Sequence, residues 1–181
     1  IHHAMFVGYG DNEGNPIHKW GPDDPITIKQ VCQVAYRIMT DTYRGSLGAG
    51  TKPVPDEVET KAVRFLMSLG IVSPADYPSE SVARTPATQA QAYRILGEAF
   101  MRDFTSYIDS PEASVSRLKL ASDICRFTER DTNPNRNGLM GRTFTDVGSF
   151  APLVAEVSNS HEYTKDSHGR ETWIKLLDNK R

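Results

Sequence analysis

Residues 25–39 read PITIKQVCQVAYRIM, and residues 86–100 repeat the same arrangement as PATQAQAYRILGEAF. In both stretches a Thr, Thr27 or Thr88, is followed three residues later by a Gln, which is the spacing of a helix capping box. Apolar residues then recur four, seven, eight and eleven positions after the Thr, as on one face of an α-helix. Because cap, box and apolar stripe coincide, the two stretches predict two copies of one helical unit.

A third, weaker copy of this frame lies at residues 114–127, SVSRLKLASDICRF. Ser116 stands at the cap position, and apolar residues occupy three of the four stripe positions. Asp123 interrupts the stripe, and Lys119 replaces the Gln of the capping box. We therefore expect a third helix from Ser116, in a degenerate copy of the repeat.

Further helices are expected before and after these copies. Apolar residues between 58 and 69 form one helical face, and Gly70 supplies the residue that ends such a helix. Residues 130–143 are polar and rich in Asn, Arg and Gly, which is typical of a linker. The last predicted helix follows residues 144–147, with its stripe at Phe150, Leu153, Val154 and Val157.

Short motifs around these helices point to a known family. They are GYGD at 8–11, WGPDDPITIKQ at 20–30, SLGIVS at 68–73, PATQAQA at 86–92, VSRLK at 115–119, FTDV at 144–147, SHEY at 160–163 and ETW at 171–173. Together they resemble the S-layer homology (SLH) family of bacterial cell-surface proteins. The repeat of that family pairs a helix ending near Gly-Ile-Ile with a second helix that opens at an Ile-Thr-Arg-Ala-Glu-like motif.

The resemblance implies an all-α fold in which repeated helix–loop–helix units pack as a pseudo-threefold bundle. The units would be repeat 1 at residues 1–50 with its first helix truncated, repeat 2 at 51–103, a degenerate repeat 3 with linker at 104–143, and a terminal helical element at 144–181. The implied function is non-catalytic. An extracellular module of this kind attaches its protein noncovalently to secondary cell-wall polysaccharide or another peptidoglycan-linked glycan, or forms part of a surface layer.

The resemblance also selects candidate ligand-binding residues. The Arg of the motif, which engages anionic sugar groups in the family, is Ile28 in the first copy, Gln89 in the second and Arg117 in the third. Arg117, Trp20 and the motif threonines Thr27 and Thr88 are therefore the candidate glycan contacts. The alternatives are a solvated Arg117 near a helix start and a Trp20 that fills the core.

Because two copies lack the motif Arg, a second function stays open: a structural or assembly subunit that keeps the SLH fold, has lost glycan binding and works through contacts with itself or other surface proteins. A third is an accessory domain of a surface enzyme. Ile1 falls inside a repeat, so we expect these residues to belong to a longer protein.

Composition excludes several other classes. The 181 residues carry a net charge of −2 and no apolar run long enough to span a bilayer, which argues against a nucleic-acid binder and a membrane-embedded segment. No nucleophile elbow, phosphate-binding loop or dinucleotide fingerprint occurs, so we expect neither an enzyme nor a cofactor.

Metal and thiol chemistry are not expected either. Cys32 and Cys125 lack the spacing of a metal or redox motif and are expected to be buried free thiols. The loop at 10–15 lacks the spacing of an EF-hand, and Lys165 stands where a zinc protease needs a second His after His161. A cluster of His161, Asp166 and His168 is more simply explained as a polar surface turn.

Overall fold

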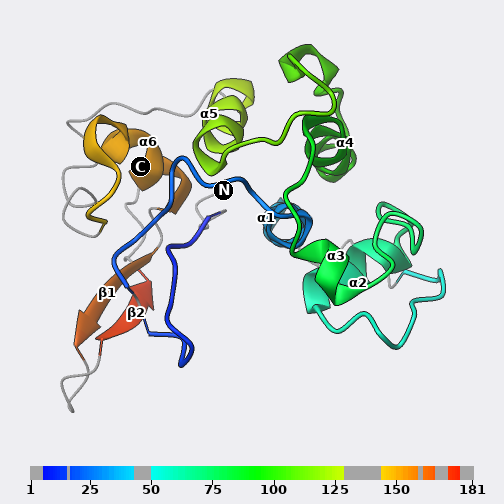
Figure 1. The fold of residues 1–181 in the computed structure, drawn as a ribbon, viewed down its shortest axis with the longest axis horizontal. Helices are drawn as coiled ribbons and strands as arrows, with labels where there is room; N and C mark the ends of the chain where they lie inside the picture. The colour runs from blue at the N-terminus through cyan, green and yellow to red at the C-terminus, as the bar shows by residue number, and fades with distance from the viewer. Residues whose placement is uncertain are drawn as a thin grey trace. The chain divides into compact units, whose positions relative to one another are not determined.

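The computed structural model describes residues 6–15, 17–42, 50–128, 144–158, 161–165 and 171–175. This part of the chain is mostly helical, in agreement with the predicted class (Figure 1). No helix in these ranges combines the length and apolar character needed to cross a membrane. In chain order the elements are α1 (Ile28–Thr42), α2 (Lys61–Ser68), α3 (Glu80–Ala83), α4 (Gln89–Phe100), the 3-10 helix η1 (Thr105–Tyr107), α5 (Arg117–Phe127), the 3-10 helix η4 (Gly148–Phe150), α6 (Ala151–Ser158), β1 (His161–Lys165) and β2 (Glu171–Lys175).

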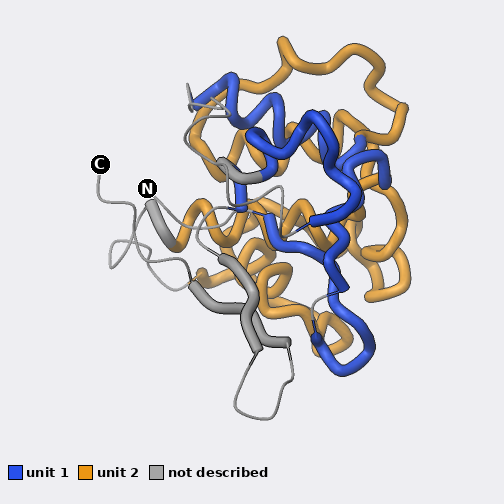
Figure 2. Tube along the Cα trace, turned by 90° about the vertical axis from the view of Figure 1, so that its left-hand side faces the viewer, with its two compact units in different colours: residues 1–24, 116–181 blue, residues 25–115 orange. Residues whose placement is uncertain are grey.

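Two compact units make up the chain, and one of them is discontinuous in sequence. The first combines residues 1–24 with 116–181, and the second contains residues 25–115 (Figure 2). The division cuts through the expected first repeat of residues 1–50, because its loop belongs to one unit and its helix α1 to the other. The repeat boundaries therefore describe sequence similarity, and they differ from the units in which the chain packs.

The unit of residues 25–115 is built on α1, which packs against both α2 and α4. The apolar stripes predicted from the sequence form its core: Val31, Val34, Ala35 and Ile38 of α1, and Ala92, Ile95, Leu96 and Ala99 of α4, are all buried. Gly70 adopts a positive φ of 79° after the last turn of α2, so the expected helix stop is confirmed. These stripes bring the two capped helices of this unit together.

The discontinuous unit joins the N-terminal segment to α5 and α6. Phe6 is buried, and its backbone N–H donates to the carbonyl of Val157 in α6 (3.2 Å). The backbone N–H of Thr145 likewise donates to the carbonyl of His18 (2.9 Å). Residues more than 120 positions apart in sequence therefore pack in one unit.

The terminal element differs from the expectation of helix across residues 144–181. Helix α6 ends at Ser158, and β1 and β2 then pair antiparallel, with Tyr163 opposite Trp173 and Thr164 opposite Thr172. Aromatic and β-branched residues favour strands, so their concentration in these two segments explains the correction. Val154 and Val157 are buried as predicted, whereas Phe150 lies in η4 and is 47% exposed, so its place on the stripe was wrong. The predicted linker at 130–143 and the residues Asp166 and His168 lie outside the described residues.

Candidate functional site

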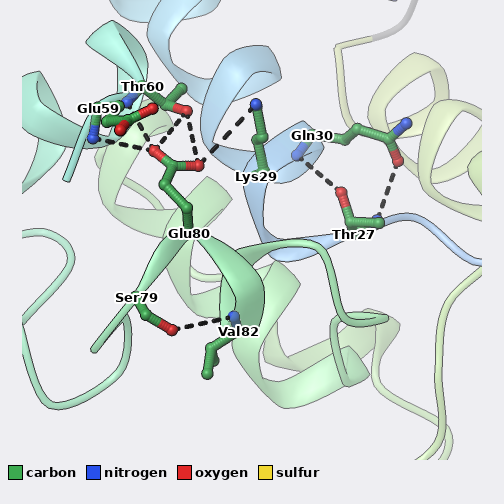
Figure 3. Close-up of polar contacts among 8 residues, drawn as sticks. All are labelled: Thr27, Lys29, Gln30, Glu59, Thr60, Ser79, Glu80 and Val82. Carbon is green, nitrogen blue, oxygen red and sulfur yellow. Dashed lines mark hydrogen bonds and ion pairs between the residues drawn. The ribbon is translucent and has the colours of Figure 1, made fainter. Parts of the chain in front are cut away.

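Thr27 and Thr88, two of the candidate glycan contacts, use their side chains to begin helices. The Thr27 hydroxyl accepts from the backbone N–H of Gln30 (3.2 Å), and the Gln30 side-chain oxygen accepts from the backbone N–H of Thr27 (3.0 Å; Figure 3). Thr88 and Gln91 form the same pair of bonds, at 3.2 and 2.9 Å. The predicted capping boxes are confirmed, and each threonine has its hydroxyl lone pair turned toward its own helix.

The third cap is confirmed in part. The Ser116 side chain accepts from the backbone N–H of Lys119 (3.1 Å), which caps α5. Lys119 does not complete a box, and its ammonium group instead contacts the carboxylate of Asp123 (2.9 Å) one turn later. Asp123, which interrupts the predicted stripe, is buried there, and its half-buried partner Lys119 compensates its charge.

The position directly after each cap carries the motif Arg in the SLH family, and here it is a buried position in all three copies. The backbone N–H at this position donates to a carbonyl three residues before another cap, and each bond lies within one compact unit. The pairs are Ile28 with Thr85 (3.2 Å), Gln89 with Ala113 (2.8 Å) and Arg117 with Asp24 (3.0 Å). The same local geometry thus recurs whichever side chain the position carries.

Gln89 replaces the motif Arg with a structural acceptor. Its side-chain oxygen accepts from the backbone N–H groups of Asp109 (2.9 Å) and Ser110 (3.3 Å). These bonds hold the loop after η1 against the start of α4. Sequence reasoning identified Gln89 only as a departure from the family motif, because the loop it binds is 20 residues away.

Arg117 lies inside the discontinuous unit and is 4% exposed, so the alternative of a solvated side chain is wrong. Its Nε donates to the Trp20 carbonyl (2.8 Å) and one Nη donates to the Val7 carbonyl (2.8 Å). Its guanidinium carbon lies 4.8 Å from the Trp20 ring centre, 4.9 Å from that of Tyr9 and 5.6 Å from that of Phe6. Aromatic faces and charge-assisted hydrogen bonds are the surroundings in which a buried guanidinium is stable.

Trp20 meets Arg117, as two members of the predicted site would, yet it is fully buried at 0% exposure. Its indole N–H donates to the Ser158 hydroxyl at the end of α6 (3.2 Å). The expected alternative, a tryptophan that fills the core, is therefore confirmed. An indole in this position has no free face for stacking on a sugar.

Asp146 is a second anchor of this region that sequence reasoning did not single out. Its carboxylate accepts from the backbone N–H groups of Trp20 (2.9 Å) and Gly21 (2.9 Å). Asp146 is the third residue of the FTDV motif, so the motif was the available signal for it. The motif and Arg117 together fix both sides of the Trp20 backbone.

Glu80 forms the other notable charged cluster, at the start of α2 (Figure 3). Its carboxylate accepts from the backbone N–H groups of Glu59 (3.0 Å) and Thr60 (2.8 Å) and lies 4.0 Å from the ammonium group of Lys29. Partial burial disfavours the charged form, but the hydrogen bonds from Thr60 outweigh it and lower the pKa of Glu80. The Thr60 side chain makes no capping hydrogen bond to α2. The carboxylate of Glu80, from a separate segment, instead accepts from backbone N–H groups at the start of this helix.

Metal-ligating side chains do not gather in the part of the chain that the structure describes. This part contains no group of three or more His, Cys, Asp or Glu placed to bind a metal ion. Cys32 and Cys125 are buried thiols outside any disulfide bond, as expected, and burial raises the pKa of the Cys32 thiol to about 12. In the loop at 10–15, the Asp11 carboxylate accepts from Glu13 and Asn15, and the hydrogen bond from the Asn15 side chain lowers its pKa.

Comparison of the chain with protein-family models, with curated proteins and with solved structures found no match.

Proposed function

We propose that the chain is a non-catalytic attachment module of a bacterial cell-surface protein, which holds its parent protein to secondary cell-wall polysaccharide. The observation that carries the proposal is the frame at Thr27, Thr88 and Ser116, where a side-chain cap and the same long-range backbone bond occur three times. Repeats of this kind bury their apolar faces against neighbouring copies and so build one continuous scaffold. In this role the module works outside the cell, with a glycan as its partner and no cofactor.

The pseudo-threefold packing of SLH repeats is part of this proposal. Its support comes from the residues directly before the three caps, Ile26, Ala87 and Val115, which are all buried within the unit of residues 25–115. The Ala87 N–H donates to the Ile26 carbonyl (2.8 Å), and the Ile26 N–H donates to the Val115 carbonyl (2.9 Å). Three equivalent positions that bond one to the next are what a repeat packed around an axis requires.

Co-sedimentation of the full chain with purified cell walls tests the attachment. We expect the chain to sediment with walls that carry their polysaccharide, to remain in solution when the polysaccharide has been stripped, and to be released by free polysaccharide. Equal sedimentation with both wall preparations, or with neither, would overturn polysaccharide attachment.

The side chains at the three motif positions, directly after the helix caps, favour a second candidate function. Ile28 and Gln89 carry no cation, and the guanidinium of Arg117 is engaged with Val7 and Trp20 inside its unit. A subunit that keeps the SLH fold and assembles through protein contacts needs no cation at these positions. Self-association at micromolar concentration, measured by analytical ultracentrifugation together with an absence of wall binding, would establish this function in place of attachment.

A further inference from the structure

Helix α6 lies beside the N-terminal segment, in the repeat that is expected to lack its first helix. In repeat 2, α2 is followed by Ile71 and Val72, and the chain then leads to the capped helix α4. In repeat 1, Phe6 and Val7 stand at the corresponding place before the capped helix α1. Helix α6 thus lies beside Phe6 as α2 lies beside Ile71.

The same backbone hydrogen bond links each helix to its segment. In repeat 2, the N–H of Ile71 donates to the carbonyl of Leu66, in the last turn of α2 (2.9 Å). In the discontinuous unit, the N–H of Phe6 donates to the carbonyl of Val157, in the last turn of α6 (3.2 Å). Phe6 and Ile71 are both buried. Phe6 therefore occupies the position at which a chain leaving α6 by a close turn would continue.

The two helices also bury corresponding positions. Each has eight residues, and the match of Leu66 with Val157 aligns the rest of the two helices without a gap. The buried pairs in this alignment are Val63 with Val154, Leu66 with Val157, and Met67 with Ser158. Positions three and four apart lie on one face of a helix, so α2 and α6 bury the same face.

Each of these helices packs against a capped helix of another copy. Helix α2 packs against α1, which begins after Thr27, and α6 packs against α5, which begins after Ser116. Helix α6 therefore has both neighbours of α2: a capped helix, and the segment that leads on to the next capped helix.

Side chains at both ends of α6 hold the far end of the N-terminal segment. The carboxylate of Asp146 accepts from the backbone N–H groups of Trp20 and Gly21, both at 2.9 Å. The hydroxyl of Ser158 accepts from the Trp20 indole (3.2 Å). Because Phe6 is bound at Val157, residues 144–158 contact this segment from its start to Gly21.

We propose that residues 144–158 form a closing strap, in which α6 supplies the first helix of repeat 1. The chain connects the strap to α5 through residues 129–143, so noncovalent contacts alone join α6 to Phe6. A docked strap holds the segment from Phe6 to Gly21 in place, and with it the carbonyl of Trp20 that Arg117 binds. This inference concerns how the chain closes on itself, and it stands whether or not the chain binds a glycan.

Cleavage between α5 and the strap tests whether these contacts suffice. A site for a specific protease is inserted between residues 136 and 137 of the full chain, which is purified and then cut. We expect the two pieces to elute together in gel filtration at about 10 μM, with the NMR signal of the Trp20 indole N–H unchanged. Separation of the pieces, or loss of this signal on cutting, would overturn the proposal.

Two substitutions in the strap supply a matched comparison. Val154→Asp places a charge at a fully buried position and is expected to weaken retention of the cut strap at least about tenfold. Phe150→Asp, at a position that is 47% exposed, should leave retention unchanged. The amide signals of α1 and α4 should persist in both uncut variants. Equal retention of the two cut straps, or loss of the α1 and α4 signals in uncut Val154→Asp, would overturn the proposal.

A circular permutant tests the order of the elements directly. The permutant begins at Phe144 and ends at Thr143, and a flexible Gly/Ser linker joins residues 181 and 1, so α6 precedes Phe6 as α2 precedes Ile71. We expect it to be a monomer with the Trp20 signal of the unmodified chain and a Tm within about 5 °C of it. An unfolded permutant would overturn the proposal, and so would a dimer in which α6 comes from a second copy.

Discussion

The sharpest test of the structure is the removal of the Arg117 side chain. Arg117→Ala deletes the donors to the carbonyls of Val7 and Trp20 and the cation between three aromatic rings. A hydrogen bond from a charged donor contributes about 1.5–3 kcal/mol, and a desolvated cation–π contact contributes about 2 kcal/mol. Because such contributions are not additive, we expect the free energy of unfolding to fall by about 3–5 kcal/mol.

Urea unfolding followed by tryptophan fluorescence and by circular dichroism measures this loss. Arg117→Lys keeps the positive charge but lacks the planar guanidinium with its several donors, so we expect it to lower the free energy of unfolding by about 1–3 kcal/mol. The matched control is Arg84→Ala, which removes an exposed guanidinium in the other compact unit, and it should lower the free energy of unfolding by less than about 1 kcal/mol.

The two roles considered for Arg117 give opposite results in this experiment. If Arg117→Ala unfolds within about 1 kcal/mol of the unmodified chain but loses wall binding, the guanidinium is a ligand contact and its buried position is refuted. If stability falls as expected while Arg117→Lys retains wall binding in proportion to its folded fraction, Arg117 acts by positioning the segment from Val7 to Trp20.

Three further outcomes follow from other sites. Because the pKa of Glu80 is lowered in the folded chain, its carboxylate stabilises the fold at neutral pH, and this stabilisation is lost as the pH falls through the folded-state pKa. Glu80→Gln should therefore lower Tm at pH 7, and the difference in Tm from the unmodified chain should vanish in acid. A difference in Tm that stays constant with pH would contradict this role of Glu80. Thr88→Ala should reduce the free energy of unfolding by about 1 kcal/mol and Thr88→Ser by much less, measured by urea titration; equal losses would show that the hydroxyl cap is not the cause. Burial and a pKa of about 12 should keep Cys32 unmodified by a thiol reagent until urea unfolds the chain, and rapid labelling of the folded protein would contradict its buried position.

Local features of the fold could be predicted from the sequence because they depend on residues a few positions apart. The capping boxes at Thr27 and Thr88, the cap at Ser116 and the glycine stop at Gly70 all require only the spacing of neighbouring residues, and all are present. The apolar stripes of α1 and α4 were readable for the same reason, since a helix places residues three and four apart on one face.

The two strands near the end of the chain were missed because the helical fold of the family was given more weight than the strand propensity of the residues themselves. The motif endings at 160–163 and 171–173 were assigned to a helical element, although Tyr163, Thr164, Thr172 and Trp173 are residues that favour strands. Each of these five-residue strands forms its hydrogen bonds with the other strand. The spacing of caps and apolar residues in the repeats carries no information about this pairing.

The sequence by itself determined where the helices begin, which faces they bury and that one frame recurs at Thr27, Thr88 and Ser116. Only the tertiary structure decided how the site candidates are used. Arg117 lies 97 residues from Trp20, and Asp146 lies 126 residues from it, so no local pattern relates them. These residues meet because the N-terminal segment packs against α5 and α6 in one unit. Arg117, the one motif Arg that this sequence keeps, is therefore buried and hydrogen-bonds a segment far from it in sequence.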